Sequence, residues 1–161
     1  MSITEYPACV HELYQSEVLG EAIFLALLKV AKNEREKYHF GTALQLETET
    51  KARLRPFMFK YGFDLVEDQD SELSDGIVAA YQEASWVEFL AGLKPLVNQF
   101  VERFQDIAAA GPAQDQAVLQ SMITHEASFV SWIDKELAGE EGSLDAIICQ
   151  LQFPLSTPGT P

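Results

Sequence analysis

Two glutamates fall on the apolar stripe of a long helical segment near the amino terminus. The stripe recurs every three or four residues, a spacing that keeps its members on one face of a helix. Its members are Val10, Tyr14, Glu17, Glu21, Phe24, Leu28 and Ala31. Burying a carboxylate costs several kcal/mol unless the group is paired, protonated or bound to a metal ion. Glu17 and Glu21 therefore indicate that other parts of the chain supply a partner, a proton or a cation.

Two later segments place further acids on inward faces. Glu47 lies on a stripe within residues 40–61. Glu126 lies at the centre of a stripe within residues 119–137, and His125 stands beside it. Carboxylates together with an imidazole are ligands for iron or manganese. The same groups can also exchange protons near neutral pH, because burial raises the pKa of a carboxyl group.

We predict that these side chains meet near mid-length of one helical bundle, and the candidate site residues follow from that prediction. The candidate metal ligands are Glu17, Glu21, Glu47, Glu126 and His125. The candidate catalytic residues are Glu17, Glu47 and His125, with the acids as proton donors or acceptors. Iron or manganese is the expected ion, and a site without metal is the alternative.

Helix signals divide the chain into four long helices and one short helix. The predicted helices span about residues 7–32, 38–61, 85–110, 113–138 and 143–153. Gly62 is a stop signal for the second, and Ser85 with Glu88 forms a capping box that begins the third. Residues 63–84, with a helical turn or two from residue 77, form a link long enough to recross a bundle. No segment shows the alternation of a β-strand, so the sequence predicts an all-α fold.

The chain resembles the ferritin-like, rubrerythrin-related superfamily over about residues 8–138. The likeness lies in SEVLGEAIFLALLKVAKN (16–33), LETETKARLRPF (46–57) and THEASFVSWIDKEL (124–137). It implies a four-helix bundle with a long crossover between helices two and three and a short carboxy-terminal helix. In that family, a Glu on helices one and three and a Glu-x-x-His on helices two and four bind two iron or manganese ions. By position, the resemblance implies Glu17 as the helix-one ligand, with Glu21 as the alternative, and Glu47 and Glu126 as the glutamates of helices two and four.

The chain departs from the family pattern at the remaining ligand positions. Thr50 on helix two and Phe129 on helix four stand where the family has histidine. The apolar stripe of helix three carries no acid, and Glu102 is the nearest candidate in sequence. His125 or His39 is then the candidate source of an imidazole.

Three uses of the inward acids remain open. The first is a metal site, mononuclear or asymmetric, in an enzyme that oxidises a small organic molecule. The second is a metal-independent acid–base enzyme, such as an isomerase, dehydratase or cyclase, that uses the same carboxylates. The third is a non-catalytic binding or structural bundle, in which the acids pair with Arg53, Arg103 or Lys51.

The composition limits the partners. The chain has 161 residues, of which 25 are acidic and 11 are lysine or arginine, for a formal net charge of -14. This excess repels phosphate backbones and anionic lipids, so we expect a small-molecule substrate and neither nucleic acid nor a membrane. Residues 1–153 are expected to form a single domain, and residues 154–161, rich in proline, threonine and glycine, a flexible tail.

Three further expectations concern the surface and the compartment. The first predicted helix is apolar on nearly every face, which indicates a homodimer through that helix or the fifth one. Cys9 and Cys149 stand far apart and indicate free thiols, so with no signal peptide recognised we expect a cytoplasmic protein. Glu49 and Glu136 are expected on solvated helix faces.

Overall fold

The computed structural model describes residues 6–67 and 71–156, which fold almost entirely into helices. Within these residues there are six α-helices, one short 3-10 helix, η1 (Ala113–Asp115), and no β-strand. The α-helices are α1 (Tyr6–Lys29), α2 (Glu34–Lys60), α3 (Ser71–Glu83), α4 (Trp86–Ala110), α5 (Gln116–Ala138) and α6 (Asp145–Ile148). No helix in this part of the chain is both long and apolar enough to cross a membrane. Because the described residues form helices and no strand, the predicted all-α class is confirmed.

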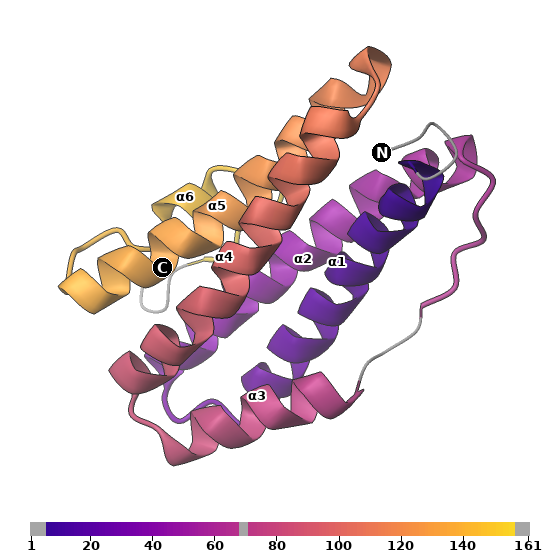
Figure 1. Cartoon of the computed structure of the whole chain (residues 1–161). Coiled ribbons are helices and arrows are strands. Elements are labelled where there is room, and N and C mark those ends of the chain that lie inside the picture. Colours follow the sequence, from indigo (N-terminus) through magenta and orange to yellow (C-terminus); the bar gives the residue numbers. More distant parts are fainter. Residues whose placement is uncertain (1–5, 68–70, 157–161) are drawn as a thin grey trace.

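The four long helices, α1, α2, α4 and α5, lie side by side as a bundle (Figure 1). α1 packs mainly against α2, and α4 mainly against α5, while contacts of α1 with α4 and of α2 with α5 join the two pairs. The chain after α2 returns alongside α1, where Gln15 Nε2 donates to the Val66 carbonyl at 2.7 Å and the Tyr14 hydroxyl donates to Glu67 Oε1 at 3.0 Å. α3 contacts α1, and α4 begins beside α3 at the opposite end of the bundle from the end of α2 (Figure 1).

Local sequence signals determine several helix ends. The Asn33 side chain caps α2 by accepting a hydrogen bond from the Glu36 amide at 2.9 Å. Ser85 and Glu88 form the predicted capping box at the start of α4. Gly62 has a φ of 76°, the left-handed conformation that lets the chain turn sharply after α2.

The structure differs from the predicted boundaries mainly in four places. α2 begins at Glu34 rather than near residue 38, because Asn33 caps it. α1 ends at Lys29 because the Lys32 amide donates to the Tyr81 hydroxyl at 2.8 Å instead of continuing the helix. α3 is a helix of 13 residues rather than a turn or two, and its Tyr81 is fully buried in the core. α6 has only four residues and begins after Ser143, whose buried hydroxyl donates to Glu136.

The core consists of two apolar clusters with a polar layer between them. The first cluster joins the amino-terminal half of α1 to the carboxy-terminal part of α2, the end of α4 and the start of α5. The second joins the later half of α1 to the earlier half of α2, the start of α4, the later half of α5 and α6. Between them lie the buried side chains of Glu17, Glu47, Thr50, His125 and Glu126.

Removing the cap tests this account of how α4 begins. Ser85→Ala should lower the free energy of unfolding by about 1 kcal/mol, because the first turn of α4 loses a hydrogen-bond acceptor for its amides. Ser85 is exposed, so the change removes little packing. Urea denaturation measures the loss. Thr124→Ala removes an exposed hydroxyl from the middle of α5 and should leave stability unchanged or slightly higher. Equal losses in the two variants would show that α4 does not depend on the cap.

Candidate functional site

The polar layer is assembled from three helices. α1 contributes Glu17, α2 contributes Glu47 and Thr50, and α5 contributes the adjacent pair His125 and Glu126. Glu17 and His125 are both 0% exposed, and the other three side chains are also buried. Three of the four glutamates selected by helical spacing, Glu17, Glu47 and Glu126, therefore lie together in the interior.

His125 lies at the centre of this group. Its Nε2 atom is 3.3 Å from Glu17 Oε2, 3.4 Å from Glu47 Oε2 and 4.0 Å from Glu126 Oε1. The other ring nitrogen, Nδ1, is 3.2 Å from the Thr50 hydroxyl oxygen. A proton on Nδ1 that is donated to Thr50 leaves the Nε2 lone pair facing the three carboxyl groups.

Several atoms of the group are buried without a hydrogen-bond partner. These atoms are both carboxyl oxygens of Glu17 and Nε2 of His125. Buried polar atoms in proteins are nearly always hydrogen-bonded, so such a concentration calls for a partner of another kind. One ligand atom from each of Glu17, His125 and Glu126 lies within 4.8 Å of the others. Carboxylate oxygens with one imidazole nitrogen form a donor set that suits iron or manganese. The residues present therefore fit a metal ion.

The electrostatics of the group follow from its burial. Burial raises the pKa of Glu17 well above its ordinary value, and the nearby carboxyl groups of Glu47 and Glu126 raise it further, while His125 opposes the shift. Burial also raises the pKa of Glu47 and the pKa of Glu126 to about 8 each. In the absence of a cation, these carboxyl groups hold protons near neutral pH.

No lysine or arginine of the described residues offsets these acids. Among residues 6–67 and 71–156, no lysine or arginine lies within ion-pair distance of Glu17, Glu47 or Glu126. Arg103 pairs with Glu12 at 2.6 Å, Lys51 pairs with Glu21 and Glu67, and Arg53 donates to the Thr50 hydroxyl at 3.4 Å. The predicted structural pairing therefore holds for Glu21, which pairs with Lys51, but Glu17, Glu47 and Glu126 have no such pair in the described part of the chain.

Glu21, the alternative ligand on α1, lies outside the group. Its Oε1 accepts a hydrogen bond from the Thr48 hydroxyl at 2.7 Å, and its Oε2 pairs with the buried Lys51. Both of its carboxyl oxygens thus have partners of their own. Glu102, the candidate ligand that the sequence offered on α4, is exposed.

A small cavity adjoins the group on the side of α4. It has a volume of about 60 Å³, enough for a few water molecules or a small organic group. Its lining is mainly apolar and comes from α1, α3, α4 and α5, while Glu47 and Glu126 supply most of the polar wall. The apolar lining includes Ile23, Phe24, Ile77, Leu93, Val97 and Phe129.

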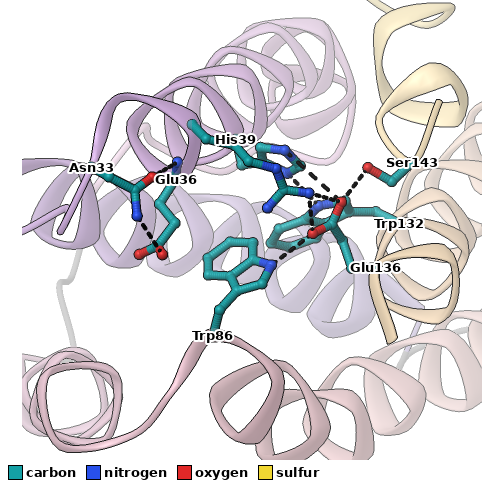
Figure 2. A network of polar contacts seen from close by, with 8 residues as sticks. Asn33, Glu36, His39, Trp86, Trp132, Glu136 and Ser143 are labelled. Atoms are coloured by element: carbon teal, nitrogen blue, oxygen red, sulfur yellow. Dashed lines mark hydrogen bonds and ion pairs between the residues drawn. The ribbon is translucent and has the colours of Figure 1, made fainter. Parts of the chain in front are cut away.

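His39, the other candidate imidazole, belongs to a separate network around Glu136 (Figure 2). Trp132 Nε1 donates to His39 Nδ1 at 2.9 Å, and His39 Nε2 is 3.9 Å from Glu136 Oε1. Glu136 also accepts hydrogen bonds from Arg35 at 2.7 and 2.8 Å, from Trp86 Nε1 at 2.6 Å and from the Ser143 hydroxyl (Figure 2).

The prediction of a solvated face for Glu136 is wrong, because Trp86 and the segment after α5 cover its carboxylate. Burial opposes ionisation of Glu136, but the hydrogen bonds from Ser143, Arg35 and Trp86 hold its pKa below the ordinary value. The network has the donors that its acid needs, which indicates a structural role.

The raised pKa of Glu47 predicts a pH-dependent stability for the metal-free protein. The folded state keeps a proton that the unfolded state releases, so this contribution to stability is lost as the pH rises from about 4.5 to about 8. Glu47→Gln removes the titration. Its stability relative to the natural chain should therefore increase with pH across that range, by at most about 1.4 kcal/mol per pH unit.

Urea denaturation in the presence of a chelator, from about pH 5 to about pH 8, measures this difference. Glu49→Gln is the matched control, because backbone hydrogen bonds from Gln152 and Phe153 outweigh partial burial and hold the pKa of Glu49 below its ordinary value. Its stability difference should be flat over the same range. A flat difference for Glu47→Gln as well would mean that Glu47 is ionised and paired throughout.

No protein-family model, curated protein or solved structure matches this chain. The all-helical bundle and its buried carboxylate–histidine group are compatible with the expected resemblance but do not establish the family. The chemistry of the site is therefore inferred from its own geometry.

Proposed function

We propose that this chain is a ferritin-like enzyme that binds iron or manganese in the group around His125 and oxidises a small organic molecule in the adjoining cavity. The observation that carries the proposal is the set of buried ligand atoms without hydrogen-bond partners, namely both oxygens of Glu17 and Nε2 of His125. These atoms converge with the carboxyl group of Glu126. A cation would satisfy all of them at once.

Charge balance supports a cation at this place. Ionised Glu17, Glu47 and Glu126 would place three negative charges in the interior, and in the described part of the chain their one basic neighbour within ion-pair distance is His125, which can offset at most one of them. An uncompensated buried charge is strongly destabilising. A divalent ion would offset two of these charges and a trivalent ion all three.

The donor types favour a first-row transition metal over calcium or magnesium. Calcium and magnesium are bound almost entirely through oxygen ligands, whereas this group has an imidazole nitrogen at its centre. Iron and manganese accept both kinds of ligand. The apolar stripe of α4 carries no acid, and Thr50 and Phe129 stand where the family has histidine, which favours one ion rather than the pair that the resemblance implies.

The residues have separate roles in this proposal. Glu17, Glu126 and His125 hold the ion, which when bound supplies redox chemistry. Glu47 borders both the group and the cavity and is 3.4 Å from His125, so it can hold a proton or pass it to a substrate. The apolar cavity wall excludes water and suits an uncharged substrate. The homodimer and the cytoplasmic location stay predictions.

A specific observation favours a second candidate function, metal-independent acid–base catalysis in the same cavity. The pKa values of Glu47 and Glu126 are raised to about 8. A carboxyl group with a pKa near the working pH can both donate and accept a proton in a catalytic cycle. An isomerase, a dehydratase or a cyclase would use such groups. We place this candidate second, because protons alone would have to satisfy both Glu17 and His125 Nε2, whereas a cation would satisfy them together.

Metal content separates the two candidates. Protein purified without chelator and then loaded with iron(II) or manganese(II) should contain about one ion per chain. Glu17→Ala and His125→Ala should lose the ion, because each removes a ligand at the centre of the group. Elemental analysis after desalting measures the content. Glu21→Gln is the matched control on α1 and should keep the ion, since Glu21 pairs with Lys51.

Two results would count against metal binding. The natural chain could take up no iron or manganese under any loading condition, which would leave the acid–base enzyme and the non-catalytic bundle. Alternatively, Glu21→Gln could lose the ion as completely as Glu17→Ala. That second result would mean that Glu21 also holds the ion or that any change on α1 releases it, so the proposed ligand set would be wrong.

Thr50 provides a test of how His125 is oriented. Thr50→Val removes the hydrogen-bond partner of His125 Nδ1 at nearly constant volume and should weaken metal binding by about 10- to 100-fold. Thr50→Ser keeps the hydroxyl and should bind within a few-fold of the natural chain. Competition with a chelating dye measures both affinities. Equal affinities in the two variants would show that the hydroxyl has no part in orienting the ring.

A further inference from the structure

Gly20 is the residue of α1 that lies against the Glu47 carboxyl group. A Cβ atom added at Gly20 would lie 2.5 Å from each carboxyl oxygen of Glu47 and closer still to the carboxyl carbon. Non-bonded heavy atoms do not approach so closely. A side chain at position 20 and the observed position of Glu47 therefore exclude each other.

This contact distinguishes Gly20 from other glycines inside helices. A Cβ atom at Gly76 in α3 or at Gly92 in α4 would meet nothing within 4 Å. Glycine in a helix interior is less favourable than alanine, so alanine at those two positions would strengthen the helix without a steric conflict. At Gly20 the same gain in helix propensity is opposed by a clash with a buried carboxyl group.

The observed position of Glu47 has two consequences for the site. Its Oε2 is 3.4 Å from His125 Nε2, and its carboxyl group also lines the cavity, as Gly20 does. Glu47 is 5% exposed, so a carboxyl group displaced from Gly20 would have to move within the interior, for example further into the adjoining cavity. Displacing the carboxyl group from Gly20 would take it out of reach of the ring, of the cavity, or of both.

We propose that Gly20 is a positioning residue for Glu47. By presenting bare backbone to α2, it allows the carboxyl group of Glu47 to lie between His125 and the cavity. The chemical purpose of that position rests on the proposed function, but the steric relation between the two residues does not.

The steric relation is tested in the metal-free protein by pairing Gly20→Ala with Gly92→Ala. In chelator, Gly92→Ala should raise the urea midpoint of unfolding, and Gly20→Ala should lower it. In a Glu47→Ala background the clash is absent, so Gly20→Ala should now raise the midpoint as Gly92→Ala does. Should Gly20→Ala alone not fold, recovery of a folded, helical protein in the double variant Gly20→Ala/Glu47→Ala supports the proposal equally. Failure of Glu47→Ala to reverse the effect of Gly20→Ala would overturn it.

Metal affinity then tests the consequence for the site. Glu47 Oε2 lies 3.4 Å from His125 Nε2, an atom proposed to hold the ion, so displacing Glu47 changes the surroundings of a ligand. Gly20→Ala should therefore weaken iron(II) or manganese(II) binding by about 10-fold or more, while Gly92→Ala should bind as the natural chain does. If the natural chain binds no metal but the stability reversal is observed, the proposed function fails and the positioning role stands. If the natural chain binds metal and Gly20→Ala binds it equally tightly, the positioning role fails and the proposed function stands.

Discussion

The burial of three carboxyl groups around one imidazole is the constraint on which the rest of this structure depends. Apolar clusters close the bundle on both sides of Glu17, Glu47 and Glu126, so water cannot solvate these acids freely. Each must carry a proton or share a cation, since ionised carboxylates without either would destabilise the folded state. The register between α1, α2 and α5 is therefore tied to the protonation or the ligand state of the layer that they share.

A second acid on α5 shows the opposite solution to the same problem. Glu136 is buried ten residues after Glu126, but Arg35, Trp86 and Ser143 donate hydrogen bonds to it. Its pKa is accordingly below the ordinary value, whereas that of Glu126 is raised to about 8. Burial alone does not distinguish a structural acid from a chemically available one. The number of hydrogen-bond donors around the acid distinguishes the two, and the acids around His125 have few donors.

Local periodicity and local hydrogen bonds predict a part of this arrangement from the sequence alone. The three- and four-residue spacing placed Glu17, Glu47 and Glu126 on inward faces, and the Ser85 capping box located the start of α4. It could not choose between Glu17 and Glu21, because both lie on one stripe of α1. That choice depends on Thr48 and Lys51 across the interface with α2.

The burial of Glu136 was equally out of reach of the sequence. It depends on the indole of Trp86 and on the chain after α5 folding over the helix end, neither of which leaves a periodic signal. The close approach of Glu47 to Gly20 is of the same kind. The sequence alone does not explain a glycine inside a helix, because the explanation lies in the side chain that the neighbouring helix places against it.

The two positions where the ferritin-like pattern has histidine offer a consistent explanation of how one histidine could suffice. Thr50 is 3.2 Å from His125 Nδ1, and the ring of Phe129 meets the imidazole edge-on, with centroids 5.1 Å apart and planes at 90°. Both side chains thus contact the histidine that α5 supplies one residue before Glu126. Because one fixes the hydrogen bond of the ring and the other packs against it, the imidazole is held with Nε2 toward the acids. Thr50 and Phe129 therefore orient the single imidazole of the layer instead of adding further nitrogen donors to it.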